Sequence, residues 1–228
     1  MTWLGIDTSD EVAVAVLRPD GTGAALADDT PRRHVEQLAP FVRELLAREG
    51  VAPGDLEAIV VGTGPAPFTG LRVGLVTARV LGLALGVPVL GVPSLDALAA
   101  AAAEHAAGAT DLLVVTDARR REVYWARYTV RDGVPVPTGG PDVAAPADVP
   151  RTDGDVVLGA GRDLYPDVFG PADPRLLPGA PQLRSPSPFH LVRLARQRSA
   201  AGQDLPVEPL YLRRPDAQPP TARKRVLA

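Results

Sequence analysis

The chain has 228 residues, of which 46% are hydrophobic, so one large domain or two small ones with a substantial core can form. Its formal net charge of −3 argues against a protein that holds nucleic acid on its own, because such binding needs a basic surface. The absence of cysteine excludes disulfides, thiolate zinc sites and cysteine nucleophiles. Neither a signal peptide nor a membrane span is indicated, and we expect a cytoplasmic protein without a membrane partner.

The first half of the chain alternates regularly between expected strands and helices. Three short strands joined by tight connections, Thr2–Asp7, Val12–Arg18 and Gly23–Asp28, predict an antiparallel meander. The next elements are a helix from Thr30 to Gly50, a strand Leu56–Gly62, a helix Gly70–Leu85, a strand Val87–Val92 and a helix from Ser94 to about Ala107. Ser94 is the expected cap of the last helix. The predicted order is β-β-β-α-β-α-β-α.

The second half begins with a strand pair from Asp111 that loosely repeats the opening of the chain. Residues 134–188 are rich in proline and glycine, and only a strand at Val156–Gly161 is indicated there. A helix follows within residues 185–202. We therefore expect an N-terminal lobe of residues 1–108 and a reduced, proline-rich C-terminal lobe of residues 109–228.

Two glycine- or hydroxyl-rich turns resemble phosphate-binding loops. VGTGPAPFTGLRVG (residues 61–74) lies between a strand and a helix, but it lacks the lysine of a P-loop, and Pro67 replaces the third glycine of a dinucleotide fingerprint. It is a phosphate loop or only a tight turn. Asp7, Thr8 and Ser9 follow the first strand and are candidate nucleotide-binding residues; the alternative is a polar hairpin.

The helix Gly70–Leu85 has apolar residues on two opposite faces, so one face can cover a sheet while the other needs a partner. We assign to a partner interface the face flanked by arginines, together with the residues of the first helix outside its main stripe. These residues are His34, Gln37, Phe41, Leu71, Arg72, Leu75, Ala78, Arg79 and Gly82. The alternative is that the two helices simply cover each other.

No metal site is expected, because none of the three histidines has a partner at metal-ligand spacing. The segment DARRREVYWARY (residues 117–128) interleaves arginines and aromatic residues, as nucleic-acid-binding segments do. Its alternation also fits a half-buried strand, which is the interpretation we favour.

Several segments together resemble one known family. These segments are LGIDTSDEVAVAVL, HVEQLAPFVRELL, the long block from Ala58 to Leu98, DARRREVYWARY and PLYLRRPDA. Their order and spacing resemble those of the bacterial TsaB (YeaZ-type) family. This family is part of the machinery that makes threonylcarbamoyladenosine in tRNA. The resemblance implies an α/β, actin-like (ASKHA) fold with two related lobes. It also implies pairing with the catalytic paralogue TsaD and with the ATPase TsaE. One departure is Ala66-Pro67, where the family has Gly-Ser.

The resemblance also implies what this chain lacks. TsaD-like paralogues carry two metal-binding histidines at positions where this chain has Ser94 and Leu98, and no glycine-rich adenosine segment is evident near the C-terminus. We therefore expect a non-catalytic scaffold with no cofactor of its own, supporting a TsaD-like subunit that transfers threonylcarbamoyl to a tRNA adenosine beside the anticodon. ATP, magnesium and the metal are expected in partner subunits, tRNA is bound only through the complex, and a homodimer is possible. The alternative is an actin-like small-molecule kinase or a glycoprotease-like hydrolase.

Overall fold

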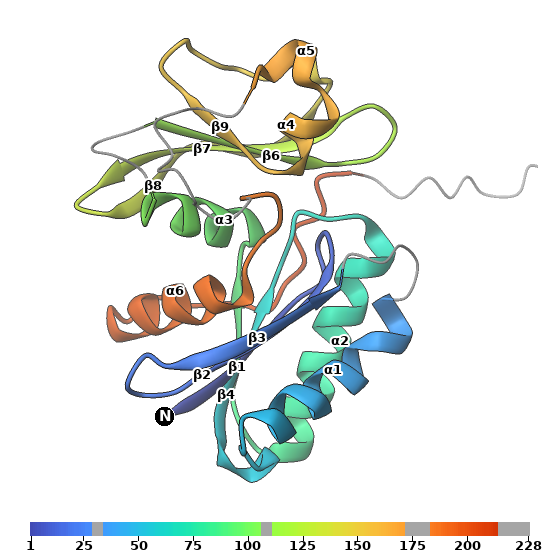
Figure 1. Ribbon diagram of the computed structural model, residues 1–228, viewed down its shortest axis with the longest axis vertical. Coiled ribbons are helices and arrows are strands. Elements are labelled where there is room, and N and C mark those ends of the chain that lie inside the picture. Colours follow the sequence, from blue (N-terminus) through green and yellow to red (C-terminus); the bar gives the residue numbers. More distant parts are fainter. Residues whose placement is uncertain (29–33, 106–110, 172–182, 214–228) are drawn as a thin grey trace, which may run out of the picture.

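The computed structural model describes residues 1–28, 34–105, 111–171 and 183–213, and the described side chains exclude those of residues 34–37. These residues form two lobes, each built on one β-sheet and placed one above the other in Figure 1. The expected start of the first helix at Thr30 and the expected end of the third at about Ala107 lie outside the described residues.

The first lobe contains a five-stranded sheet in the order β3-β2-β1-β4-β5. Its strands are β1 (Thr2–Asp7), β2 (Val12–Leu17), β3 (Gly23–Asp28), β4 (Leu56–Gly62) and β5 (Val89–Val92). β2 is antiparallel to β1 and β3, whereas β4 is parallel to both β1 and β5. β1, β2 and β4 are nearly continuous buried apolar runs, as a sheet covered on both faces requires.

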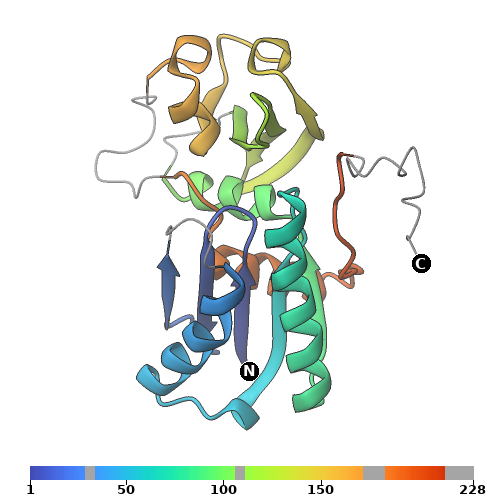
Figure 2. The ribbon, with the colours of Figure 1, turned by 90° about the vertical axis from the view of Figure 1, so that its right-hand side faces the viewer.

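Helices cover both faces of this sheet. α1 (His34–Arg48) and α2 (Phe68–Leu85) lie side by side on one face, and α6 (Pro188–Ala200) lies on the other (Figure 1 and Figure 2). α3 (Ser94–Ala103) lies between the two lobes (Figure 1). A short 3₁₀ turn, η1 (Pro53–Asp55), precedes β4. The expected β-β-β-α-β-α-β-α order is confirmed.

The second lobe repeats this plan in reduced form. Its sheet has the order β8-β7-β6-β9, from β6 (Asp111–Asp117), β7 (Val123–Arg131), β8 (Val134–Ala144) and β9 (Val156–Leu158). β6, β7 and β8 are antiparallel, and β9 is parallel to β6, as β4 is to β1. Short helical turns complete the lobe: η2 (Pro146–Asp148), α4 (Ala160–Leu164) and α5 (Pro166–Phe169). This repetition is what an actin-like fold with two related lobes requires.

The chain does not divide at residue 108 as expected. α6 returns to the first lobe, where its buried Leu191 and Val192 join a core cluster with Trp3 and Val60 of the first sheet. Of the described residues, the first lobe therefore contains those up to 105 and, in addition, α6. Sequence order could not show this, because a helix with one apolar stripe fits either sheet.

A final extended segment, which we call the C-terminal strap (residues 205–213), covers the edge of β5. The Gly91 N–H donates to the Leu205 carbonyl at 2.9 Å, and the Leu210 N–H donates to the Thr63 carbonyl at 2.9 Å. These bonds satisfy backbone groups that an open sheet edge would expose.

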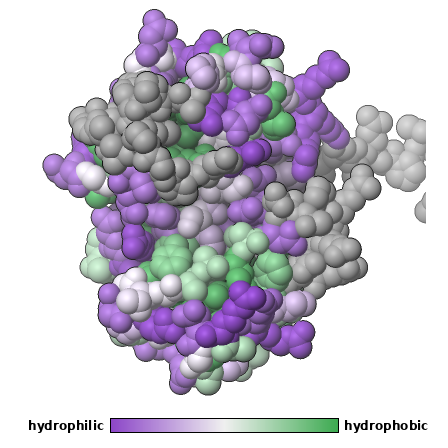
Figure 3. Space-filling view, viewed as in Figure 1, coloured by the Kyte–Doolittle hydropathy of each residue, from purple (hydrophilic) through white to green (hydrophobic). Residues whose placement is uncertain are grey.

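The outer surface of the first lobe is the more apolar of the two in the view of Figure 3, where green side chains gather across its middle and purple dominates the second lobe. At one edge of the first sheet, β3 exposes Ala25 and Ala27.

Candidate functional site

The expected nucleotide-binding residues lie at the junction of the lobes, but their polar atoms are bonded within the chain. Asp7 ends β1 and is 1% exposed. One carboxylate oxygen accepts hydrogen bonds from the Ser9 N–H at 2.8 Å and from the Ser9 hydroxyl, and the other accepts one from the Ser94 hydroxyl at 2.7 Å. Burial raises the pKa of Asp7 to about 6, although these hydrogen bonds oppose the rise. The Asp7 carboxylate therefore fixes the turn to α3.

Ser94 does not cap α3 as expected. Its hydroxyl points instead to Asp7 and accepts a hydrogen bond from the Gly64 N–H at 3.2 Å. Its N–H donates to the Gly64 carbonyl at 2.8 Å. Ser94 and Leu98, which the family resemblance sets at the positions of the paralogue's histidines, are both fully buried.

The glycines of the loop between β4 and α2 allow this close packing. A Cβ atom at Gly62 would lie 2.0 Å from an Asp7 carboxylate oxygen, and one at Gly74 would lie 2.4 Å from the Thr8 hydroxyl oxygen. Thr8 itself is buried and donates its hydroxyl hydrogen to the Gly70 carbonyl at 2.8 Å. The loop thus closes onto the β1–β2 turn.

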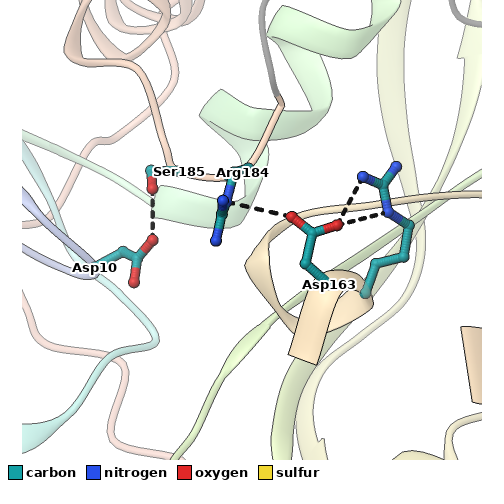
Figure 4. Close-up of polar contacts among 5 residues, drawn as sticks. Asp10, Asp163, Arg184 and Ser185 are labelled. Atoms are coloured by element: carbon teal, nitrogen blue, oxygen red, sulfur yellow. Dashed lines mark hydrogen bonds and ion pairs between the residues drawn. The ribbon is translucent and has the colours of Figure 1, made fainter. Parts of the chain in front are cut away.

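A second set of polar contacts joins this turn to the other lobe. The Ser185 hydroxyl donates to the Asp10 carboxylate, and Arg184 forms an ion pair of 3.2 Å with Asp163 of α4, which Arg162 also contacts (Figure 4). The segment before α6 therefore contacts both lobes and connects them.

A trio of side chains, two of them buried, fixes α3 between the lobes. Asp96 of α3 accepts a hydrogen bond of 2.8 Å from the Tyr128 hydroxyl of β7 and forms an ion pair of 2.6 Å with Arg198 of α6. Burial, and then the charge of Asp96, raise the pKa of Tyr128 well above its ordinary value. Three elements from both lobes thus converge on one carboxylate.

The face of α2 that we assigned to a partner is the face that packs on the sheet. Leu71, Leu75, Ala78 and Gly82 are all buried in the structure. A Cβ atom at Gly82 would lie 2.3 Å from a methyl carbon of Val89, so the small residues admit β5 rather than a partner helix. The assignment of these four residues to an interface is therefore wrong.

The opposite face of α2 carries the exposed apolar side chains. Val76, Val80 and Leu83 are 58%, 59% and 86% exposed and lie one turn apart along the helix. We call them the outer row. None of these three residues is among those that the sequence analysis assigned to the interface. The line of glycine and alanine at every fourth position was the signal that could have identified the inner face.

The two flanking arginines hold the C-terminal strap. Arg72 donates from Nε to the Tyr211 hydroxyl at 3.1 Å, and its guanidinium carbon lies 3.8 Å from the centre of the Phe68 ring. Phe68 stacks on Tyr211 with ring centres 4.4 Å apart. Arg79 donates to the Val207 carbonyl. Both arginines thus have partners within the chain.

The expected interface residues of α1 divide into two groups. Phe41 is half-buried and packs against the core of the first lobe. His34 and Gln37 belong to α1, but their side chains lie outside the described ones. α1 and α2 contact each other, so part of each helix is covered by the other, as the alternative interpretation required.

Two further properties bear on the site. Among the described residues, no group of three or more histidine, aspartate or glutamate side chains is placed to hold a metal ion. By length and composition alone, α2 could cross a membrane, and it is the one such helix in the described ranges. Its inner face is packed on the first sheet, which is how a core helix lies.

Comparisons with known proteins agree with this geometry. The family model of TsaD, tRNA N6-adenosine threonylcarbamoyltransferase, matches residues 26–154. An uncharacterized protein of Mycobacterium leprae is 44% identical over 96% of this chain, which spans only 56% of that protein's length. The tRNA threonylcarbamoyladenosine biosynthesis protein TsaB of Escherichia coli is 33% identical, with 93% of this chain and 95% of that protein covered.

The solved structures include YeaZ from Pseudomonas aeruginosa, with a TM-score of 0.75, 32% identity, and coverage of 92% of this chain and 99% of that chain. The similarity therefore extends over both lobes, beyond the part that the family model matches. The chain belongs to the TsaB (YeaZ-type) family and shares the family model of TsaD.

Proposed function

We propose that this chain is a non-catalytic subunit that supports a TsaD-like paralogue in the transfer of threonylcarbamoyl to a tRNA adenosine next to the anticodon. The observation that carries the proposal is the outer row of α2, an apolar strip on a helix whose inner face is already packed. A strip of this kind marks a protein–protein contact rather than a substrate site.

A paralogue with the same fold fits this strip. It would present a corresponding pair of helices on its own first lobe, so the two pairs could pack as a bundle with the outer row at its centre. A second copy of this chain would present the same surface, and a homodimer would then compete with the paralogue. Arg72 and Arg79 would lie at the edge of this contact, where they hold the strap.

The non-catalytic role is supported by the lobe junction. Asp7 and Thr8 are buried and bonded within the chain, so neither side chain is accessible to a substrate. Ser94 and Leu98 are buried where the paralogue's metal-binding histidines would stand. No specific observation favours the alternative of a kinase or hydrolase, which requires accessible polar groups in the cleft.

The remaining parts of the proposal follow from this role. A TsaE-like ATPase and the TsaD-like subunit would supply ATP, magnesium and the catalytic metal. The tRNA would be held by the complex rather than by this chain alone, whose net charge is −3. The chain would act in the cytoplasm, where tRNA is modified.

Co-expression with the TsaD-type paralogue of the same organism tests the proposal. We expect the two chains to co-purify and Val80→Glu to weaken their association at least tenfold, because it would bury an unpaired charge. Leu164→Glu is the matched control, since Leu164 is also exposed but lies on α4 of the other lobe. Equal association of both variants would contradict this interface. Turnover or tight ATP binding by the isolated chain would favour the kinase or hydrolase.

A further inference from the structure

The turn between β6 and β7 carries the only run of three consecutive arginines in the sequence, Arg119–Arg121. We call it the arginine turn. All three side chains are exposed, and all three residues have left-handed backbone angles, with φ of 59°, 57° and 61°. Residues with side chains rarely adopt this conformation, and three in succession need support from their surroundings.

The C-terminal strap supplies part of that support. Arg213 donates from Nη1 to the Ala118 carbonyl at 2.8 Å and forms an ion pair with Glu122. Within the turn, the Ala118 N–H donates to the Glu122 carbonyl at 3.1 Å, and the Asp117 carboxylate accepts a bond from the Arg119 N–H at 2.7 Å. The turn is therefore fixed before any ligand arrives.

The charges around the turn leave it positive. Among the described residues of the turn and of the strap beside it, there are four arginines, Arg213 included, and two carboxylates, those of Asp117 and Glu122. Arg119 pairs with Asp117 at 2.9 Å yet keeps 72% of its side chain exposed, and Glu122 pairs with Arg213. Arg120 and Arg121 are exposed as well. This local excess contrasts with the net charge of −3 for the whole chain.

The geometry of the turn limits what it can bind. Successive side chains of a left-handed turn point about 100° apart, so the three guanidinium groups spread out and cannot converge on one small anion. A polyanion with regularly spaced phosphates can instead offer a separate phosphate to each guanidinium group. The aromatic residues of β7 cannot add base stacking, because Tyr124, Trp125 and Tyr128 are buried. The chemistry is therefore that of a phosphate backbone without base recognition.

We propose that the arginine turn contacts the phosphate backbone of the tRNA while the tRNA is held by the complex with the catalytic paralogue. This inference rests on the proposed function. A contact with two or three phosphates is too weak to hold tRNA alone, which agrees with the acidic character of the chain as a whole. It would orient tRNA that the partner binds.

The test measures tRNA affinity of the assembled complex between 0.05 and 0.2 M salt for the double variant Arg120→Asn/Arg121→Asn. Asparagine tolerates left-handed angles, so the turn should persist. We expect the slope of log K against log salt to fall in magnitude by about 1.5 and the affinity at 0.1 M salt to fall by about tenfold. Arg120→Lys/Arg121→Lys should restore most of the affinity, because lysine keeps the charge.

Arg131→Asn is the matched control, since Arg131 is an exposed arginine at the other end of β7. Its salt slope should equal that of the unmodified complex. Should the asparagine variant fail to fold by circular dichroism, the single variant Arg121→Gly, which suits a φ of 61°, takes its place. An unchanged slope, or a loss of partner association in place of tRNA affinity, overturns this inference. Failure of the unmodified chains to associate overturns the proposed function itself.

Discussion

The turn after β1 and the turn after β6 occupy equivalent places in the two related sheets, yet they behave in opposite ways. Asp7 and Thr8 of the first turn are buried and bonded to Ser94 and Gly70. The arginines of the second turn are exposed and held in place from behind by Arg213. One hairpin plan thus gives a packing element in one lobe and a charged surface in the other. Side-chain size and charge decide the outcome, because only small polar groups fit beneath α2.

The first prediction tests this comparison by filling the space into which the first turn packs. Gly62→Ala would place a methyl group 2.0 Å from an Asp7 carboxylate oxygen and 2.6 Å from the Ser94 hydroxyl oxygen. We expect a loss of about 4 kcal/mol in the free energy of unfolding, measured by urea denaturation, because a buried polar network must separate. Gly54→Ala is the control, since its Cβ would meet no atom within 4 Å. Equal stability of the two variants would contradict the packed junction.

The second prediction separates the two faces of α2. Leu75→Ala removes a side chain that is 4% exposed and should cost about 3 kcal/mol of unfolding free energy. Val80→Ala removes one that is 59% exposed and should cost about 0.5 kcal/mol or less in the isolated chain. Thermal denaturation of both variants checks the order. A larger loss at Val80 would mean that the isolated chain already buries the outer row, for example in a homodimer.

These faces also show how far sequence reasoning could go. Element order, the relation of the lobes and the family follow from strand and helix patterns and from long matching segments. Which side of α2 is the inner one does not, because both sides are apolar and periodicity carries no direction. We assigned Ala78 and Gly82 to a partner interface, whereas both are buried against the sheet and Gly82 admits β5. Close approach calls for small residues whether the neighbour is a partner or the chain itself.

Long-range contacts account for the other differences. Ser94 is a good capping residue by local rules, but its hydroxyl donates a hydrogen bond to Asp7, 87 positions earlier, instead of capping the helix. α6 returns to the first sheet after the whole second lobe has formed, which no local signal indicates. The proline-rich stretch from residue 134 begins with an edge strand, β8, where proline is tolerated because, among the described strands, only β7 pairs with it.

A third prediction uses the titration of Asp7. Its pKa is about 6 in the folded chain against an ordinary value of 3.8, so between these values the folded state binds more protons than the unfolded state. Stability from this group therefore falls as pH rises from about 4 to 6, by about 2 to 3 kcal/mol in total. Asp7→Asn should remove this part of the slope. Urea denaturation of both forms at several pH values gives the difference, and parallel curves for the two proteins would contradict a raised pKa.

The smallest effect is expected at the second turn and has the opposite sign. Arg121 has a φ of 61°, a conformation that costs an ordinary residue about 1 kcal/mol and glycine almost nothing. Glycine loses more backbone entropy on folding, so Arg121→Gly should stabilise the isolated chain by only about 0.5 kcal/mol. The control is Arg131→Gly, where the residue lies in β7 at an ordinary strand conformation and glycine should destabilise. Thermal denaturation compares the two. If both substitutions destabilise equally, the arginine turn carries no backbone strain. If Arg121→Gly stabilises the chain while weakening tRNA binding by the complex, the sequence keeps an unfavourable backbone for the sake of the charge it presents.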